Sequence, residues 1–527
     1  MKVLFLLVFL FSVVLNSFSQ NDTIWTKCLG GSNDEVVGVF EKSQALVMPL
    51  PDSTFILVSN TYSNDGMMSS SHGSTDVFMA KMNYDGDTIW TKLIGGPDID
   101  IPTGIDVDAS GNIAICGYTY SVSGDFYGHH GDSTLGEPDG FIALYDINGN
   151  KTWAYQYGGT EASGIGGDDF LYDVHFMANG DLIATGTTSS INGDLNFVLD
   201  VYYCGWFLRV NSYGTVNKSS KVWGGDHDEY NSNDLFRIIA LPNGKFVGYG
   251  QQWYFLTSNL WMVQFDSYGN IDWEEVYGPA SGDAYACDFE STSTGGYIAM
   301  GYINGTGGDV GPTYNGGSSD TWVFTTDSAG TLIDDQCFGG SVGELAYRLQ
   351  PVDNDFLLLG SSSSHDGYAP GDSLGYTEFW MVRFNEDLDT SFTMSFGGSN
   401  IDKLLSAMPI GNNELIVAGS TGSNDGWVHG NYGGEDIYVA RLTTTPAFVH
   451  EFSTDGFLVY PNPAKSTIRC EMTLNNAEYE IFNYSGQLIE AGQTDGIINI
   501  ESYDSGLYIL RILDENSGWR SASFIKE

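Results

Sequence analysis

Positive charge is scarce in this sequence. Only 20 of its 527 residues are lysine or arginine, against 67 aspartates and glutamates, so the formal net charge is −47. Such a chain repels nucleic acids and anionic membranes, and neither is an expected partner. The favoured interpretation of the acidic residues is that they keep an extracellular protein soluble. The alternative is that clustered carboxylates bind Ca²⁺, although no EF-hand spacing occurs.

Long hydrophobic runs are absent after the first residues. A basic start, an apolar run over 3–15 and small residues at Ser17 and Ser19 are typical of a secretory signal peptide, predicted at 1–19. That run is too short to span a membrane comfortably, and no later segment is long enough. We therefore expect an exported protein without a transmembrane segment after signal cleavage.

Cysteines and catalytic motifs are also few. The six cysteines are scattered and mostly lie within apolar strand patterns, so we interpret them as small buried hydrophobic residues. The motifs HExxH, GxSxG and CxxC and the phosphate-binding P-loop are missing. Carboxylates are too numerous to single out a glycosidase pair. No catalytic and no metal-ligating residue is predicted, and we favour a protein that is not an enzyme.

Glycine and aromatic residues, in contrast, are plentiful and recur periodically. The segment DTIWTKCLGG at 22–31 returns as DTIWTKLIGG at 87–96. Similar glycine pairs recur at intervals of roughly 60 residues, which is typical of a repeat architecture. The first residues of these pairs, counting a degenerate Gly-Pro, are Gly30, Gly95, Gly158, Gly224, Gly278, Gly339 and Gly397.

An apolar strand with an aromatic third residue precedes most glycine pairs. Because every repeat has this aromatic residue, packing is a better explanation for it than ligand binding. Asn-Gly and Asp-Gly turns predict hairpins on either side. The aromatic residues are Phe78, Phe141, Trp206, Trp261, Trp322, Trp380 and Tyr438.

These features predict an all-β fold, a seven-bladed β-propeller of four-stranded units over 20–445. The seventh unit lacks its fourth strand, and 22–31 is a fourth strand without its first three. We expect this N-terminal strand to close the ring. A linker at 446–456 and a small immunoglobulin-like β-sandwich at 457–527 are predicted to follow.

The most variable segments suggest where a ligand binds. Connections between the second and third strands are long, and they should emerge on the same face as the glycine pairs. Recurring Ser and Asp residues there are interpreted as turn caps. Residues that break the repeat are better candidates for binding, and exposed aromatic side chains suit sugars. The candidates are His129, His130, Trp253, Tyr254, Trp427, His429 and Tyr432.

The last part of the chain resembles a known family. It contains YPNP, then a YSGQL turn, SGLYIL and a terminal lysine. In this order they resemble the type A C-terminal sorting domain of the type IX secretion system of Bacteroidota-type bacteria. The resemblance implies the type IX machinery as a partner, and a protein that is secreted or attached to the outer surface. The matching residues are Tyr460, Pro461, Asn462, Pro463, Gly486, Gly506, Tyr508 and Lys526.

The repeat region resembles secreted propellers with W-x4-GG repeats. A pattern at 146–153 is similar to quinoprotein repeats, but their full repeat is absent, so no quinone and no other cofactor is predicted. The leading hypothesis is a surface or secreted binding or adhesion module for glycans or surface proteins. The alternatives are a secreted carbohydrate-active enzyme with its site on the long-loop face, and a structural protein stabilised by Ca²⁺.

Overall fold

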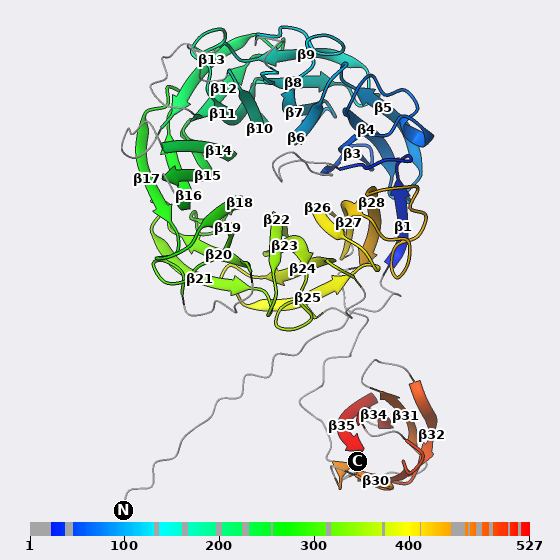
Figure 1. Cartoon of the computed structure of the whole chain (residues 1–527). Helices are drawn as coiled ribbons and strands as arrows, with labels where there is room; N and C mark the ends of the chain where they lie inside the picture. Colours follow the sequence, from blue (N-terminus) through cyan, green and yellow to red (C-terminus); the bar gives the residue numbers. More distant parts are fainter. Residues whose placement is uncertain are drawn as a thin grey trace, which may run out of the picture. The chain divides into compact units, whose positions relative to one another are not determined.

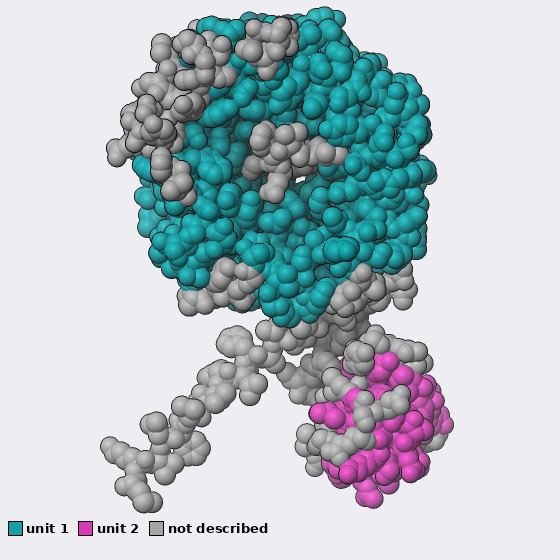
Figure 2. Space-filling view, viewed as in Figure 1, with its two compact units in different colours: residues 1–16, 20–444 teal, residues 17–19, 445–527 magenta. Residues whose placement is uncertain are grey.

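The structure is a computed structural model that divides into two compact units, residues 1–16 with 20–444, and residues 17–19 with 445–527 (Figure 2). The described residues are 23–36, 46–130, 136–160, 167–195, 203–223, 231–254, 257–311, 318–370, 375–411, 413–443, 459–461, 464–470, 477–483, 488–503, 506–514 and 518–526. The predicted signal peptide and linker therefore lie outside the described residues.

The described part of the first unit forms seven four-stranded antiparallel sheets, numbered here in chain order. Figure 1 shows them around a common centre, with the first strand of each sheet innermost and the fourth at the periphery. Sheet 1 contains β2 (Leu46–Pro49), β3 (Thr54–Thr61), β4 (Asp76–Asn83) and β5 (Thr88–Ile94); sheet 2 contains β6 (Asp100–Val107), β7 (Ile113–Thr119), β8 (Asp139–Tyr145) and β9 (Lys151–Tyr157); sheet 3 contains β10 (Asp169–Phe176), β11 (Leu182–Thr188), β12 (Cys204–Val210) and β13 (Val216–Val222); sheet 4 contains β14 (Asn231–Ala240), β15 (Phe246–Tyr254), β16 (Thr257–Phe265) and β17 (Ile271–Tyr277).

The remaining sheets follow the same order. Sheet 5 contains β18 (Ala284–Ser291), β19 (Tyr297–Ile303), β20 (Asp320–Thr326) and β21 (Leu332–Phe338); sheet 6 contains β22 (Glu344–Val352), β23 (Asp355–Ser362), β24 (Glu378–Phe384) and β25 (Thr390–Phe396); sheet 7 contains β26 (Asp402–Gly411), β27 (Glu414–Thr421), β28 (Asp436–Thr443) and β1 (Thr23–Leu29). The single short helix described is the 3₁₀ turn η2 (Gly66–Met68), between β3 and β4. The prediction of an all-β fold is confirmed.

Sheet 7 joins the two ends of the first unit. Strand β1 pairs antiparallel with β28, with Trp25 opposite Arg441 and Cys28 opposite Tyr438. The Trp25 indole also donates a hydrogen bond of 2.9 Å to the Tyr84 carbonyl in the turn between β4 and β5. An N-terminal segment therefore supplies the outer strand of the sheet that is otherwise formed last along the chain.

The core lies between neighbouring sheets. The seven aromatic residues predicted to pack are all buried, at 0 or 1% exposure. Trp322, for example, packs in a cluster formed by sheets 4 and 5, and Trp380 in one formed by sheets 5 and 6. Third strands are apolar on both sides because each is covered by a sheet on either face. The interpretation of these aromatic residues as core residues is confirmed.

Tight turns connect the third and fourth strands, as their sequences predict. In the turn after β8, the Asp146 carboxylate accepts hydrogen bonds from the Asn148 and Asn150 amides, at 2.8 and 2.9 Å. Gly149 there has a φ of +76°, which favours glycine. Short turns of this kind leave the long connections on the other face of the sheets.

The second unit has its own small core. It contains a three-stranded sheet and a four-stranded sheet, and Ile468, Ile481, Leu510 and Phe524 are among its buried residues. The strands are β29 (Val459–Tyr460), β30 (Thr467–Cys470) and β33 (Ile497–Asn499) in the first sheet, and β32 (Leu488–Thr494), β31 (Ala477–Asn483), β34 (Gly506–Asp514) and β35 (Gly518–Lys526) in the second.

The cysteine side chains are reduced and mostly buried. Only Cys287 is partly accessible, while the others are buried as the sequence predicts. No described helix has both the length and the apolar character needed to cross a membrane.

Candidate functional site

The long connections converge on the face that carries the glycine pairs. In each case compared, a backbone amide of the connection in one sheet donates to the carbonyl of the first glycine in the preceding sheet. The hydrogen bonds are Asp125 to Gly95 at 2.9 Å, Asp194 to Gly158 at 2.9 Å, Tyr368 to Gly339 at 3.0 Å and Trp427 to Gly397 at 2.9 Å. The predicted placement of long loops and glycine pairs on one face is therefore confirmed.

The recurring loop aspartates cap the glycine turns of the neighbouring sheet. Asp65, Asp366 and Asp425 each accept a hydrogen bond of 2.7 Å from the amide that follows a glycine pair. Because their carboxylates serve the same backbone position in three sheets, the turn-cap interpretation accounts for this recurring motif.

A cavity of about 870 Å³ opens among the first strands of sheets 2 to 6. Each of these strands has a β-bulge at the same position, and the extra residue of the bulge lines the cavity. A bulge turns a side chain away from the regular alternation of the strand. The bulged residues are Thr103, Tyr172, Phe236, Cys287 and Tyr347.

The cavity lies at the long-loop end of the strands. Its lining includes Asp168, just before β10, and Tyr203, just before β12, together with Tyr120, just after β7. At this end of the sheets the first and third strands begin and the second strands end. The cavity therefore belongs to the face on which the sequence predicts a ligand. Figure 2 shows the first unit hollowed at its centre.

Aromatic side chains form much of the cavity wall. The rings of Tyr285 and Tyr302 are stacked, with centroids 4.6 Å apart and planes 15° apart. Trp253 meets Tyr285 edge to face at 6.0 Å, and 39% of its surface remains exposed. Aromatic faces of this kind can stack against the apolar face of a sugar ring. The other aromatic lining residues are Tyr120, Phe170, Tyr172, Tyr203, Phe236 and Tyr347.

Two carboxylates from neighbouring sheets face the same cavity. Asp234 of β14 accepts hydrogen bonds from the Thr187 hydroxyl at 2.7 Å and the Trp253 indole at 2.9 Å. Asp168 accepts one from the Tyr203 hydroxyl at 2.8 Å. Burial raises the pKa of Asp168, and the Tyr203 hydrogen bond only partly offsets this. The two acids therefore differ in electrostatic environment.

Ion pairs also link the first strands of sheets 4, 5 and 6. The Arg237 guanidinium lies 2.9 Å from Asp288, and Arg348 lies 3.6 Å from the other oxygen of the same carboxylate. His175 lies 3.1 Å from Asp173. Burial alone would raise the pKa of Asp173, but His175 and Arg237 lower it to about 2. The arginine pairs tie β14, β18 and β22 together, and the Ile238 amide of β14 donates a hydrogen bond of 3.1 Å to Asp173 of β10.

The sequence-predicted binding residues fall into three groups. Trp253 lines the cavity, and its neighbour Tyr254 is exposed beside it without being part of the lining. Trp427, His429 and Tyr432 lie far along the chain, in the connection between β27 and β28 of sheet 7.

The two predicted histidines lie outside the cavity lining, between sheets 2 and 3. The His129 ring is 3.0 Å from Asp139, and the His130 ring is 3.5 Å from Asp194. Hydrogen bonding to Asp139 raises the pKa of both histidines. The structure thus brings the predicted binding residues to one face but places only Trp253 in the cavity.

Sequence reasoning missed most of the cavity because it regarded the innermost strands as scaffold. The missed residues include Asp168 and Asp234, together with the tyrosines of sheets 3, 5 and 6. One signal was available in the sequence. Aromatic residues, tyrosine among them, recur early in these strands, as in FLYDVHF at 170–176, although the narrow centre of a packed propeller does not require large polar side chains.

In the second unit, the described residues of the sorting motif lie on its strands, apart from Pro461, which directly follows β29 (Val459–Tyr460). Tyr460 ends β29, Gly506 begins β34, and Tyr508 is buried within β34. Lys526 ends β35 and lies opposite Gly506. Asn462, Pro463 and Gly486 lie outside the described residues.

Comparisons with protein families identify both units. Residues 458–527 match the secretion system C-terminal sorting domain, and residues 89–123 match the β-propeller repeat. The first unit is thus a β-propeller, and the second is a type IX secretion sorting domain. The chain is an exported protein that is secreted or attached to the outer surface, as the sequence predicts. The comparison with curated proteins gives no match.

Solved structures with similar architecture are distant. One is a protein of unknown function from Dyadobacter fermentans, with 12% identity and a TM-score of 0.40, covering 80% of this chain and 98% of that one. PorZ, a surface component of the type IX secretion system of Porphyromonas gingivalis, has 12% identity and a TM-score of 0.28, with 90% and 68% coverage. An α-L-arabinofuranosidase of Fusarium graminearum has 9% identity and a TM-score of 0.39, with 80% and 98% coverage. Such distant similarities say nothing about what this chain binds.

Proposed function

We propose that this exported β-propeller is a binding module for glycans, and that the cavity among the first strands of sheets 2 to 6 is its ligand site. The observation that carries the proposal is the lining itself. Aromatic faces and hydrogen-bonding polar side chains line one cavity, and ligand sites combine apolar and polar groups in this way.

The wall suits a sugar in both its apolar and polar parts. Trp253 offers a half-exposed ring, while its indole nitrogen holds Asp234 in place. A carboxylate is a hydrogen-bond acceptor, which is the kind of group that sugar hydroxyls contact. The net charge of −47 disfavours anionic ligands, so neutral glycans are the favoured class.

Alanine substitution at two adjacent residues tests this proposal. Trp253→Ala should weaken glycan binding about tenfold or more, because it removes a central aromatic contact. Tyr254→Ala is the matched control, since Tyr254 is equally exposed at 38% but does not line the cavity. The measurement is a glycan array with the exported protein, followed by calorimetric titration of each variant. Equal losses in both variants, or no glycan bound at all, would contradict the proposal.

A carbohydrate-active enzyme is the second candidate. It is favoured by Asp168 and Asp234, which come from neighbouring sheets and have different environments within one cavity. Glycosidases use two carboxyl groups with separate roles. Appearance of shortened products from a bound oligosaccharide, abolished by Asp168→Asn, would favour this candidate over a binding module.

We also infer a finer architecture for both units. The seven sheets form one seven-bladed ring, closed where β1 joins β28, and the sorting domain is an immunoglobulin-like sandwich. The pairing of β1 with β28 supports the first inference. The three-stranded and four-stranded sheets around one core support the second.

A further inference from the structure

The first glycine of a pair lies between two acidic side chains from neighbouring sheets. A Cβ atom at Gly95 would collide with the carboxylates of Asp76, at the start of β4, and Asp100, at the start of β6. The same holds at three other junctions. Because glycine has no side chain, the two acidic side chains can occupy the space beside it. Those junctions are Gly30 with Asp436 and Glu35, Gly158 with Asp139 and Asp169, and Gly339 with Asp320 and Glu344.

The two acids of the Asp76–Asp100 pair have unequal sets of donors. Both are fully buried. Asp100 accepts hydrogen bonds from the Gly96 amide at 2.7 Å, the Ser121 hydroxyl at 3.1 Å and the Thr119 hydroxyl. Asp76 accepts one from the His72 amide at Oδ2, but its buried Oδ1 has no partner among the described residues.

The same oxygen lacks a donor at other junctions. Oδ1 of Asp139 and Oδ1 of Asp436 are also buried without a hydrogen-bond partner among the described residues. At Gly30 both Asp436 Oδ1 and Glu35 Oε2 would meet the added Cβ atom, so the vacant oxygen lies beside the second acid. The oxygen that faces the partner carboxyl group therefore lacks a hydrogen-bond donor.

Sheet 4 offers a natural variant of this arrangement. Asn259 occupies the position of Asp76 there, and its amide oxygen would meet a Cβ atom at Gly278. An amide is neutral and has nearly the shape of a protonated carboxyl group. The junction thus accepts an uncharged side chain at the position where five other sheets carry an acid, and sheet 3 has Cys204 there.

We propose that the paired acids at these junctions share a proton, which supplies the missing donor and leaves one negative charge per pair. The propeller then takes up protons as it folds, and mild acid stabilises it. A metal ion would need more ligands, and no group of three or more His, Cys, Asp or Glu among the described residues is arranged to hold one.

Two carboxylates in a dry space repel strongly, and burial favours their protonated forms. Burial raises the pKa of Asp100 to about 7 and that of Glu35 to about 8. An acid with a raised pKa in the folded state contributes stability that is present in acid and is lost as the pH rises through that pKa. The expected loss therefore begins at about pH 4, the ordinary pKa of the unfolded acids, and ends at about pH 8.

The charged neighbours of the Asp76–Asp100 pair are few. On the preceding connection, the His72 ring lies 3.4 Å from Asp76 Oδ2 and is half-exposed. On the following connection, Asp125 accepts a hydrogen bond from the Gly95 amide and pairs with Lys151 at 2.6 Å. His72 therefore faces the carboxylate oxygen that already has a donor.

The other pairs have their own charged neighbours. Around Asp436 and Glu35, the Asp34 carboxylate caps the Glu435 amide, and Glu435 pairs with Lys403 at 3.2 Å. The pair at Gly158 differs, because His129 and His130 face Asp139 and can supply positive charge. The Asp76 and Asp436 junctions are thus the better test sites.

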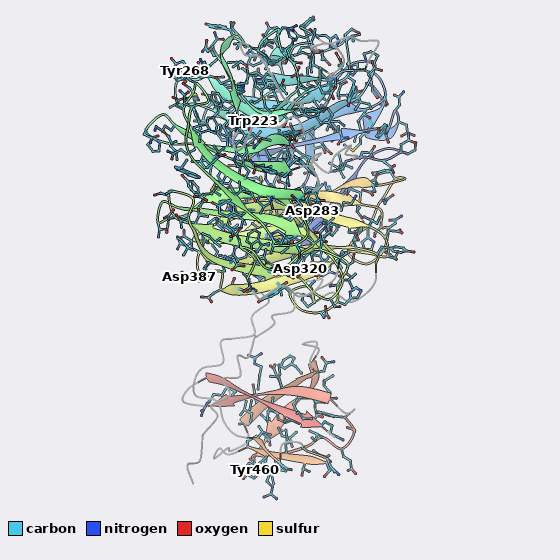
Figure 3. The ribbon with its side chains drawn as sticks, turned by 60° about the vertical axis from the view of Figure 1, so that its left-hand side comes forward. Trp223, Tyr268, Asp283, Asp320, Asp387 and Tyr460 are labelled. Carbon is cyan, nitrogen blue, oxygen red and sulfur yellow. The ribbon has the colours of Figure 1, made fainter. Side chains whose placement is uncertain are left out.

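The test is Asp76→Asn in the full-length exported protein. Thermal unfolding should show no change from wild type at about pH 4.5 and a melting temperature about 1–2 °C higher at pH 8, where the wild-type pair is forced to ionise. Asp436→Asn should behave in the same way. Asp387→Asn, which removes an exposed charge at the periphery, is the matched control and should show no such pH dependence (Figure 3). His72→Gln should keep the wild-type trend.

Proton release on unfolding gives a second measurement that does not depend on melting temperatures. Unfolding of the wild type at pH 6.5 should release protons, and Asp76→Asn should release fewer. Destabilisation by Asp76→Asn at both pH values would overturn the proposal. So would a fall in wild-type melting temperature on addition of a chelator, which would assign the space to a divalent cation, or the absence of proton release.

Discussion

At the scale of single residues, the glycine pairs carry the strictest steric demand in the propeller. The first glycine leaves room for two buried carboxyl groups, and its carbonyl accepts an amide from the next sheet. The glycine is therefore needed for space, since no positive φ is involved at Gly95. The space left by the missing side chain thus lets acidic residues of two neighbouring sheets approach each other.

Gly95→Ala is therefore expected to destabilise the protein by about 1–3 kcal/mol, the cost of overpacking a filled site. Gly422→Ala is the matched control. Its added Cβ would stay 3.5 Å or more from its neighbours, and its backbone does not need glycine. Denaturant unfolding of both variants checks the prediction, and equal stabilities would contradict it.

At the scale of elements, β1 is the strand whose position matters most. It covers the outer edge of β28, which would otherwise expose unpaired backbone groups. Exposed edges of this kind promote association between chains. A segment that begins the chain therefore protects a strand that lies more than four hundred residues later.

Deletion of residues 21–31 should expose β28, lower the melting temperature and cause aggregation, measured by thermal unfolding and light scattering. A synthetic peptide of residues 22–31 added during refolding should restore part of the loss. Deletion of the same number of residues from the predicted linker at 446–456 is the control. An unchanged melting temperature after deletion of 21–31 would refute closure by β1.

At the scale of the whole molecule, the two units have separate roles. The sorting domain at 458–527 directs export, while the propeller carries the cavity. Each unit has its own core, and the family matches fall on different parts of the chain. Export and ligand binding should therefore be separable.

Removal of residues 458–527 should leave the protein inside the cell envelope, whereas the full-length chain reaches the cell surface or the medium. Fractionation and immunoblotting of a type IX-competent host check this expectation. A host without the type IX machinery is the control and should retain both forms. Release of the truncated chain into the medium would contradict the assignment of the sorting domain as the export signal.

The sequence by itself determined the all-β class, the repeating unit, the strand positions and the sorting domain. These features depend on local signals: an aromatic third residue such as Trp322, a turn such as that around Gly149, and an N-terminal strand that completes a partial repeat. The repeats make these features predictable from sequence, because the same local pattern recurs several times along the chain.

Only the tertiary structure decided where the cavity lies and what the glycine pairs enclose. The cavity wall depends on β-bulges that turn Tyr172 and Tyr347 inward, and a bulge leaves no clear mark in sequence. Asp168 and Asp234 line one cavity because two sheets lie side by side, and Asp76 meets Asp100 across a junction between sheets. Such pairs are set by the spacing between sheets, which no single repeat encodes.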